Sequence, residues 1–162
     1  MQLEIKKYPD RLLEKKAETI REINPGIKEL ILNMKETMIS KNGVGLSAPQ
    51  VGISKKIIVV NFQDSLRAFI NPEIVRKSLE KTREKEGCLS FPGLWLDISR
   101  SRVVKVKALD EAGREIMIEA KDSMARIFQH EIDHLKGILF FERLGLFEKL
   151  KLKRDLRKPL WT

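Results

Sequence analysis

Residues 128–137 place the only two histidines of the 162-residue chain in one His-Glu-x-x-His pattern. Residues four apart lie on one face of an α-helix, so His130 and His134 can offer imidazole nitrogens to a single metal ion. Glu131 lies at the edge of the same face, where a carboxylate can act as a general base. The pattern therefore predicts a helix that carries a hydrolytic metal site.

The residues around this pattern predict that the helix is buried. At about 100° of rotation per residue, an apolar sector adjoins the histidine face and only a narrow polar stripe remains. A helix of this kind is expected in the middle of its domain. We expect Asp122 as its N-cap and Gly137 as its C-terminal stop. The apolar sector consists of Met124, Ala125, Phe128, Ile132 and Leu135.

The same three residues could also form an ordinary half-buried helix face. The metal interpretation is favoured because the pattern uses every histidine in the chain. It needs a further ligand. Zinc proteases with this pattern usually take a third His or Glu from downstream, but no histidine remains there, and Glu142 and Glu148 lie at spacings that those proteases do not use.

The only cysteine lies upstream, in the sequence Glu-Gly-Cys-Leu-Ser at residues 86–90. Two imidazoles and one thiolate form an accepted set of three ligands, and they leave a fourth position for water, as a catalytic site needs. Cys88 is therefore a candidate third ligand, although a buried inert thiol and a reactive one stay possible. A single cysteine excludes an internal disulfide, which agrees with a reducing compartment.

Length and charge restrict the remaining possibilities. A chain of 162 residues is most simply one domain, residues 1–162, and no apolar run is long enough to span a bilayer. We expect a cytoplasmic protein with no membrane or DNA partner. The net charge of +9 and the pI near 9.7 favour a polyanionic neighbour such as RNA or the ribosome.

The order of the other elements predicts the α+β class. A helix should begin at Asn24 and Pro25, bury a stripe of aliphatic and methionine residues, and stop at Gly43. After this helix, apolar residues recur with a period of two, which is typical of β-strands. Residues 110–113 are expected to form a hairpin connection between two of these strands. We expect antiparallel sheets around the central helix, with further helices before and after. The predicted strands are residues 57–60, 68–70, 103–109 and 115–120.

A third stretch, residues 43–50, reads Gly-Val-Gly-Leu-Ser-Ala-Pro-Gln. Glycines allow a backbone to approach a ligand closely, and the Gln50 amide can donate to a developing oxyanion. Together with the cysteine stretch and the histidine helix, in this order and spacing, it resembles the three signature motifs of bacterial peptide deformylase. The resemblance runs from the Tyr-Pro-Asp arm at residues 8–10 to about Arg143. Ser47 departs from the family, which commonly has alanine there, and could add a hydrogen bond.

The resemblance implies one divalent metal ion bound by Cys88, His130 and His134. Fe²⁺ is the usual native ion of the family, with Zn²⁺, Ni²⁺ or Co²⁺ as substitutes. The implied reaction uses metal-activated water to remove the formyl group from N-formylmethionine at the start of nascent peptides. Glu131 would take up the proton and return it to the leaving amine.

Further roles follow from the resemblance alone. The side-chain amide of Gln50 and the backbone N–H of Leu89 would hold the oxyanion. Backbone groups near Val44, Gly45 and Gly87 would pair with the extended peptide as an added strand. The apolar slot for the methionine side chain would be lined by Val44, Leu89, Ile127 and His130.

Three features outside the signature motifs each allow two interpretations. Arg100 could pair with Asp133 and hold the metal helix, or both could be solvated charges. Trp95 could lie at the mouth of the site, although a satellite core aromatic is favoured. The basic segment 147–158 is predicted to form a helix that binds the ribosome near the peptide exit, as the resemblance implies, or else a solvated charged face.

Three classes of function remain after these observations. The leading one is a metallohydrolase that acts on the formylmethionine end of peptides. The second is a metalloprotease that cuts internal amide bonds, and the missing downstream ligand argues against it. The third is a basic RNA-binding or ribosome-binding module with a structural metal, in which Glu131 would have no necessary role.

Overall fold

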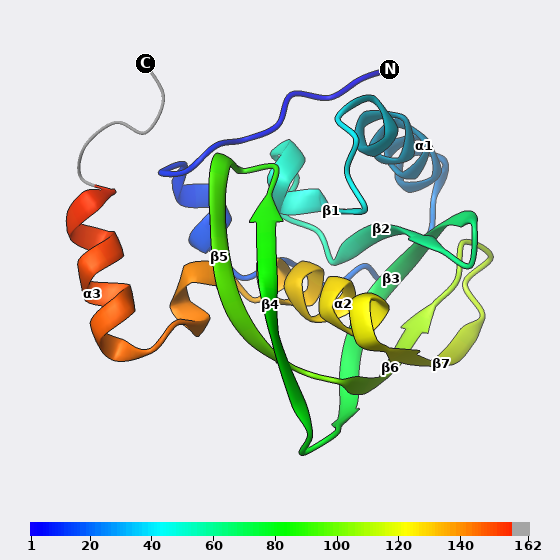
Figure 1. Ribbon diagram of the computed structural model, residues 1–162. Coiled ribbons are helices and arrows are strands. Elements are labelled where there is room, and N and C mark those ends of the chain that lie inside the picture. The colour runs from blue at the N-terminus through cyan, green and yellow to red at the C-terminus, as the bar shows by residue number, and fades with distance from the viewer. Residues whose placement is uncertain (157–162) are drawn as a thin grey trace.

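Helix α2 (Asp122–Leu135) packs against a five-stranded antiparallel sheet and against a separate two-stranded hairpin (Figure 1). These elements are seen in a computed structural model, which describes residues 1–156. The α+β class is as predicted. The sheet has the order β1 (Gly45–Ser47), β2 (Ile57–Phe62), β3 (Ser65–Lys77), β6 (Val103–Leu109), β7 (Glu115–Lys121), and the hairpin consists of β4 (Lys81–Cys88) and β5 (Phe91–Ser101).

Helix α1 (Pro25–Ser40) begins as its sequence predicts. The Asn24 side chain accepts a hydrogen bond from the Ile27 N–H at 3.0 Å, which satisfies a backbone donor of the first turn. The predicted stop at Gly43 is wrong. The helix ends at Ser40, and Asn42 takes the left-handed conformation with φ of 53°. Asparagine tolerates this conformation because its short side chain bonds locally.

The two ends of α2 differ in how well the sequence predicted them. Asp122 is not the N-cap but the first helical residue, preceded by Lys121, and its carboxylate accepts from Arg102 Nε at 2.8 Å. Gly137 does end the helix, with φ of 73°. The N–H of Ile138 then donates back to the carbonyl oxygen of Asp133 at 2.9 Å, which closes the last turn.

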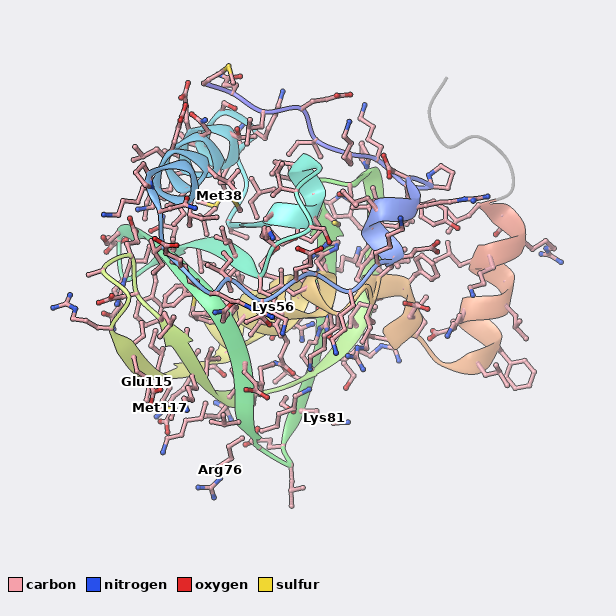
Figure 2. The ribbon with its side chains drawn as sticks, turned by 180° about the vertical axis from the view of Figure 1, so that it is seen from behind. Met38, Lys56, Arg76, Lys81, Glu115 and Met117 are labelled. Carbon is pink, nitrogen blue, oxygen red and sulfur yellow. The ribbon has the colours of Figure 1, made fainter. Side chains whose placement is uncertain are left out.

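The apolar side of α2 forms the main core with the five-stranded sheet. Phe128 lies within an aromatic cluster, with ring centroids 5.0 Å from Phe69 and 6.1 Å from Phe62. The opposite side of the sheet packs under α1. Seen from behind, Arg76 of β3 and Glu115 and Met117 of β7 point to solvent (Figure 2). The core residues around Phe128 include Ile58, Val60, Val104, Val106, Ala125, Ile132 and Leu135.

The four predicted strands are all present, and β2 and β3 extend beyond their predicted ends. The turn at residues 110–113 is present too: Asp110 donates its N–H to the Arg114 carbonyl oxygen at 2.9 Å, and Gly113 has φ of 83°. Strands β4 and β5 were not predicted. They form a long hairpin that lies over α2 and brings Cys88 to the helix (Figure 1).

Shorter elements complete the described chain. Helix α3 (Leu146–Asp155) begins one residue before the predicted segment 147–158, of which residues 157 and 158 lie outside the described part. Leu152 packs against the core cluster of Phe140 and Phe141, while the rest of α3 is largely exposed. None of the helices within residues 1–156 is long and apolar enough to cross a membrane. The 3₁₀ turns are η1 (Arg11–Glu14), η2 (Ala48–Val51) and η3 (Phe140–Arg143).

Candidate metal centre

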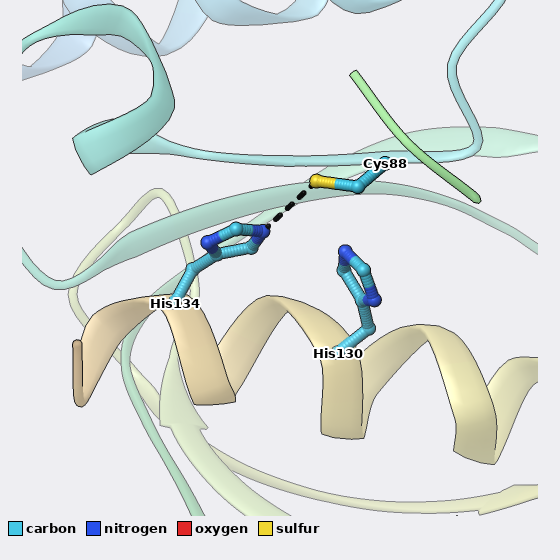
Figure 3. Close-up of side chains that lie close together, drawn as sticks. All are labelled: Cys88, His130 and His134. Carbon is cyan, nitrogen blue, oxygen red and sulfur yellow. Dashed lines mark hydrogen bonds between the residues drawn. The ribbon is translucent and has the colours of Figure 1, made fainter. Parts of the chain in front are cut away.

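Three potential metal ligands converge from two elements (Figure 3). His130 and His134 project from one face of α2, and Cys88 comes from the end of β4. The three ligand atoms lie within 4.8 Å of one another, and Cys88 Sγ is 3.3 Å from His134 Nε2. Tetrahedral zinc bonded to sulfur and nitrogen would separate those two atoms by about 3.6 Å. The donor set therefore fits a divalent metal ion.

Glu86 orients one of these ligands. His130 Nδ1 lies 2.8 Å from Glu86 Oε1, so its Nε2 is left for a metal. Burial alone would raise the pKa of Glu86, but hydrogen bonds from His130 and Arg100 hold that pKa at about 2. The carboxylate is thus ionised at neutral pH. A carboxylate behind a ligating imidazole fixes its tautomer and increases its basicity as a ligand.

Arg100 connects the hairpin to the metal helix. Its guanidinium donates to both oxygens of Glu86, at 2.9 and 3.0 Å, and to Asp133 Oδ2 at 2.6 Å. The predicted contact between Arg100 and Asp133 is confirmed, and the alternative of two solvated charges is wrong because both are buried. Two partners were not predicted: Arg143 also donates to Asp133, at 2.6 and 2.9 Å, and Arg126 donates to Glu86 at 2.7 Å.

Glu131 lies in the same buried face of α2. Its Oε2 has no hydrogen-bond partner among the described residues, and burial raises the pKa of its carboxyl to about 7. Gly45 of β1 lies against it. A Cβ atom at position 45 would lie only 2.7 Å from Glu131 Oε1, closer than real contacts allow. Glycine is therefore needed there for the carboxylate to keep its place.

Gln50 belongs to η2 and reaches the cysteine from the other side. Its Nε2 donates to Ser90 Oγ at 3.3 Å and lies 3.5 Å from Cys88 Sγ. Its Oε1 accepts two hydrogen bonds from Ser47, one from the backbone N–H and one from the hydroxyl, both at 2.9 Å. The serine that departs from the family motif thus makes the additional hydrogen bond that the sequence suggested.

Two of the apolar residues predicted to bind substrate, Leu89 and Ile127, lie beside the 43–45 stretch. A Cβ at Gly45 would also meet Ile127 at 3.0 Å, and one at Gly43 would meet Leu89 at the same distance, so both apolar side chains lie beside the 43–45 stretch. Val44 is 61% exposed. Gly45 and Ile127 therefore lie beside each other near Glu131, and Val44 is exposed to solvent.

Trp95 is not a core residue, because 66% of it is exposed. It pairs with Gly87 across the hairpin, and a Cβ on Gly87 would lie 2.9 Å from its ring. The glycine thus lets the indole ring lie flat against the backbone. This places Trp95 on the surface of the hairpin, opposite the residue before Cys88 in β4, rather than in a satellite core.

Sequence reasoning missed Glu86, the most connected side chain of the site. It ends a charged run, Lys-Thr-Arg-Glu-Lys-Glu at residues 81–86, that looks solvated. One signal could have identified it: in an extended strand, Glu86 and Cys88 lie on the same face. A carboxylate two residues before a metal-binding cysteine is then in reach of the same helix.

Comparisons with known proteins agree with this geometry. The family model described as polypeptide deformylase matches residues 2–150. A peptide deformylase from Thermodesulfovibrio yellowstonii is 52% identical over 99% of this chain and 97% of that protein, and one from Pelotomaculum thermopropionicum is 46% identical over 90% and 94%.

The solved structures that are similar to this chain are also peptide deformylases. The crystal structure of the peptide deformylase from Thermus thermophilus superimposes with a TM-score of 0.90 at 39% identity, covering 96% of this chain and 93% of that one. The enzyme from Ehrlichia chaffeensis in complex with actinonin gives 0.90 at 37% identity, with 99% of each chain covered. The chain belongs to the polypeptide deformylase family, the metal-dependent hydrolases that remove the formyl group from the N-terminal formylmethionine of newly synthesised polypeptides.

Proposed function

We propose that Cys88, His130 and His134 hold the single metal ion of this enzyme and that the native ion is Fe²⁺. The convergence of the three ligand atoms supports the ligand set, and so does the carboxylate of Glu86 behind His130. The choice of Fe²⁺ rests on the family resemblance, because thiolate and imidazole also suit Zn²⁺, Ni²⁺ and Co²⁺. When bound, the cation would lower the pKa of a water molecule and polarise the formyl carbonyl.

Glu131 is proposed to move the proton. Its carboxylate would accept the proton of the attacking water and then deliver it to the nitrogen of the leaving methionine. Two features support this role: its burial on the face that carries the histidines, and a pKa raised to about 7, which suits proton exchange near neutral pH. Formate and a free α-amine are the products.

The oxyanion of the tetrahedral intermediate needs fixed donors. We assign this role to the Gln50 side-chain amide and to the backbone N–H of Leu89. Gln50 Nε2 lies beside Cys88, and four hydrogen bonds to neighbouring side chains and backbone define the position of its amide. Donors that are held in place before the reaction stabilise developing charge without reorganisation.

The peptide is proposed to bind as an added strand. β1 is at the edge of the five-stranded sheet and β4 pairs with β5, so each strand has an outer edge without a strand partner within residues 1–156. Gly45 belongs to β1 and Gly87 to β4, and Val44 precedes β1; backbone groups at these three residues would pair with the substrate. The methionine side chain would enter an apolar slot lined by Val44, Leu89, Ile127 and His130.

The test measures formate release from formyl-Met-Ala-Ser by protein purified without oxygen. The parent should release formate, and Glu131→Ala, compared at equal metal content, should be slower by about 10²- to 10⁴-fold. A casein assay run in parallel tests the metalloprotease alternative. Cleavage of casein without formate release by fully metal-loaded parent would contradict the proposal. The proposed function depends mainly on one observation, the three-ligand cluster beside buried Glu131.

We further infer that α3 binds the ribosome, which would keep the enzyme in the cytoplasm. The helix exposes Leu146, Phe147 and Leu150, and lysines at 149, 151 and 153 add positive charge. Contacts with ribosomal RNA phosphates would make binding fall steeply with salt. Ribosome co-sedimentation at rising salt should show this loss, and deletion of the residues after Phe147 should abolish binding. Binding that survives the deletion would overturn the inference.

A further inference from the structure

We propose that the hydroxyl of Ser47 is a positioning group for deformylation. It donates to Oε1 of Gln50 beside the Ser47 backbone N–H and thereby helps to hold the amide with its nitrogen, rather than its oxygen, towards the metal ligands. The inference rests on the proposed role of Gln50 as an oxyanion donor. It concerns the one signature position at which this chain carries serine where the family commonly has alanine.

The amide of Gln50 is held at both ends. Its Oε1 receives the Ser47 N–H and the Ser47 O–H at 2.9 Å each, and an amide oxygen has two lone pairs to accept them. Its Nε2 points the other way, to Ser90 Oγ at 3.3 Å and Cys88 Sγ at 3.5 Å. Every hydrogen bond around the amide thus agrees with one orientation.

The opposite orientation would be unfavourable in this environment. Rotation of the amide by 180° would bring its NH₂ group against the Ser47 N–H, which cannot accept a hydrogen bond. It would also bring the carbonyl oxygen towards the cysteine sulfur. Ser47 is 0% exposed and Gln50 is 1% exposed, so no bulk water reaches the pair to replace a lost bond.

Alanine at position 47 would keep the backbone donor and lose the hydroxyl donor. One of the two bonds that hold the amide oxygen in place would disappear. The loss of the hydroxyl would weaken oxyanion binding in a second way. A donor on the carbonyl end of an amide polarises its N–H, so the hydroxyl strengthens donation from Nε2. Both effects act on the transition state, in which negative charge develops on the substrate oxygen, more than on substrate binding.

Bonds other than that of the hydroxyl also hold the backbone around Gln50. The N–H of Lys6 donates to the Gln50 carbonyl oxygen at 2.7 Å, and Gly52 ends the turn with φ of 85°. The N–H of Tyr8 donates to the Ser90 carbonyl oxygen at 3.0 Å. Removal of the Ser47 hydroxyl should therefore leave the turn in place and change only the side-chain amide.

The experiment is a double-mutant cycle on formate release. Ser47→Ala should lower kcat by about three- to tenfold, the effect of one hydrogen bond, with KM unchanged. In the Gln50→Ala background the same substitution should have no effect, because the amide that it positions is gone. Ser101→Ala serves as the control, since Ser101 is also buried but lies at the end of β5.

A spectroscopic measurement separates this inference from the proposed function. In zinc-loaded protein labelled with ¹⁵N, the side-chain NH₂ of Gln50 should exchange more slowly with solvent in the parent than in Ser47→Ala. Equal exchange rates would overturn the positioning role, even if the parent released no formate. A loss of kcat that is the same with and without Gln50 would overturn it too, because that result indicates a general structural effect.

Discussion

Glu86 links the metal centre to the rest of the protein at the scale of a single residue. Its carboxylate accepts from His130, Arg100 and Arg126, and the side chain is buried. Three donors compensate the burial of one negative charge, so the carboxylate stays ionised. An ionised carboxylate at this position would make His130 a stronger and better oriented ligand in the proposed metal site.

Replacement of Glu86 by glutamine tests this role. Glu86→Gln keeps the size of the side chain and removes its charge. We expect metal affinity to fall by about 10- to 100-fold, the usual effect of losing a partner behind a ligating histidine. Competition with a chelator measures the affinity. Glu84→Gln is the matched control, because Glu84 is two residues away and mostly exposed; its metal affinity should match the parent. Equal affinity in Glu86→Gln would contradict the role.

The catalytic candidates could be predicted from the sequence because their chemistry is local. His130, Glu131 and His134 fall within five residues, and the helical period alone brings the histidines together. Cys88 could be predicted because it is the only cysteine. Glu86 and Arg143 could not be, because their importance depends on contacts with residues 44 and 10 positions away. A charged residue in a charged run shows nothing of such a contact.

At the scale of elements, the hairpin of β4 and β5 is attached to α2 by buried charges. Arg100 of β5 lies between Glu86 of β4 and Asp133 of α2, so one guanidinium contacts two further elements. Asp133 also holds Arg143 of η3. Charged side chains of α2 are therefore covered by the hairpin and paired with it, which explains how a helix with charged residues can be central to the fold.

The loss of Arg100 should destabilise the protein strongly. Arg100→Met keeps the apolar stem but leaves two buried carboxylates short of a partner, which typically costs about 3–5 kcal/mol of folding free energy. Urea unfolding of the metal-free protein measures the change. Arg102→Met is the matched control: Arg102 also bonds two carboxylates, Glu80 and Asp122, but its side chain is 46% exposed. Its loss should cost far less than that of Arg100, because solvent screens an exposed ion pair. Equal losses in the two variants would contradict a special role for Arg100.

The hairpin was also the part of the fold that the sequence did not predict. Strands β6 and β7 show apolar alternation because one face packs on α2, and β2 is a continuous apolar run because its two faces pack on α1 and α2. In β4, the residue that faces inward is Glu86, so burial and polarity coincide and the period of two disappears. The prediction failed where the sheet uses ion pairs in place of an apolar face.

At the scale of the whole molecule, the proposed metal site joins two parts of the chain that are far apart in sequence. Cys88 comes from the hairpin, and the histidines come from α2, 42 and 46 positions later. An unfolded chain does not hold these ligands together, so metal binding favours the folded state. The metal should therefore stabilise the global fold as well as provide the chemistry.

Removal of the metal should consequently lower the melting temperature. At a free concentration of about 1,000 times Kd, a ligand specific for the folded state adds about 4 kcal/mol, and a domain of this size gains about 2–4 °C per kcal/mol. Calorimetry should thus show a Tm about 8–16 °C higher for zinc-loaded than for metal-free protein. Cys88→Ser should lose most of that difference, because a serine hydroxyl is a poor ligand for zinc. A metal-induced rise in Tm that is undiminished in Cys88→Ser would mean that the ion binds somewhere other than between the hairpin and α2.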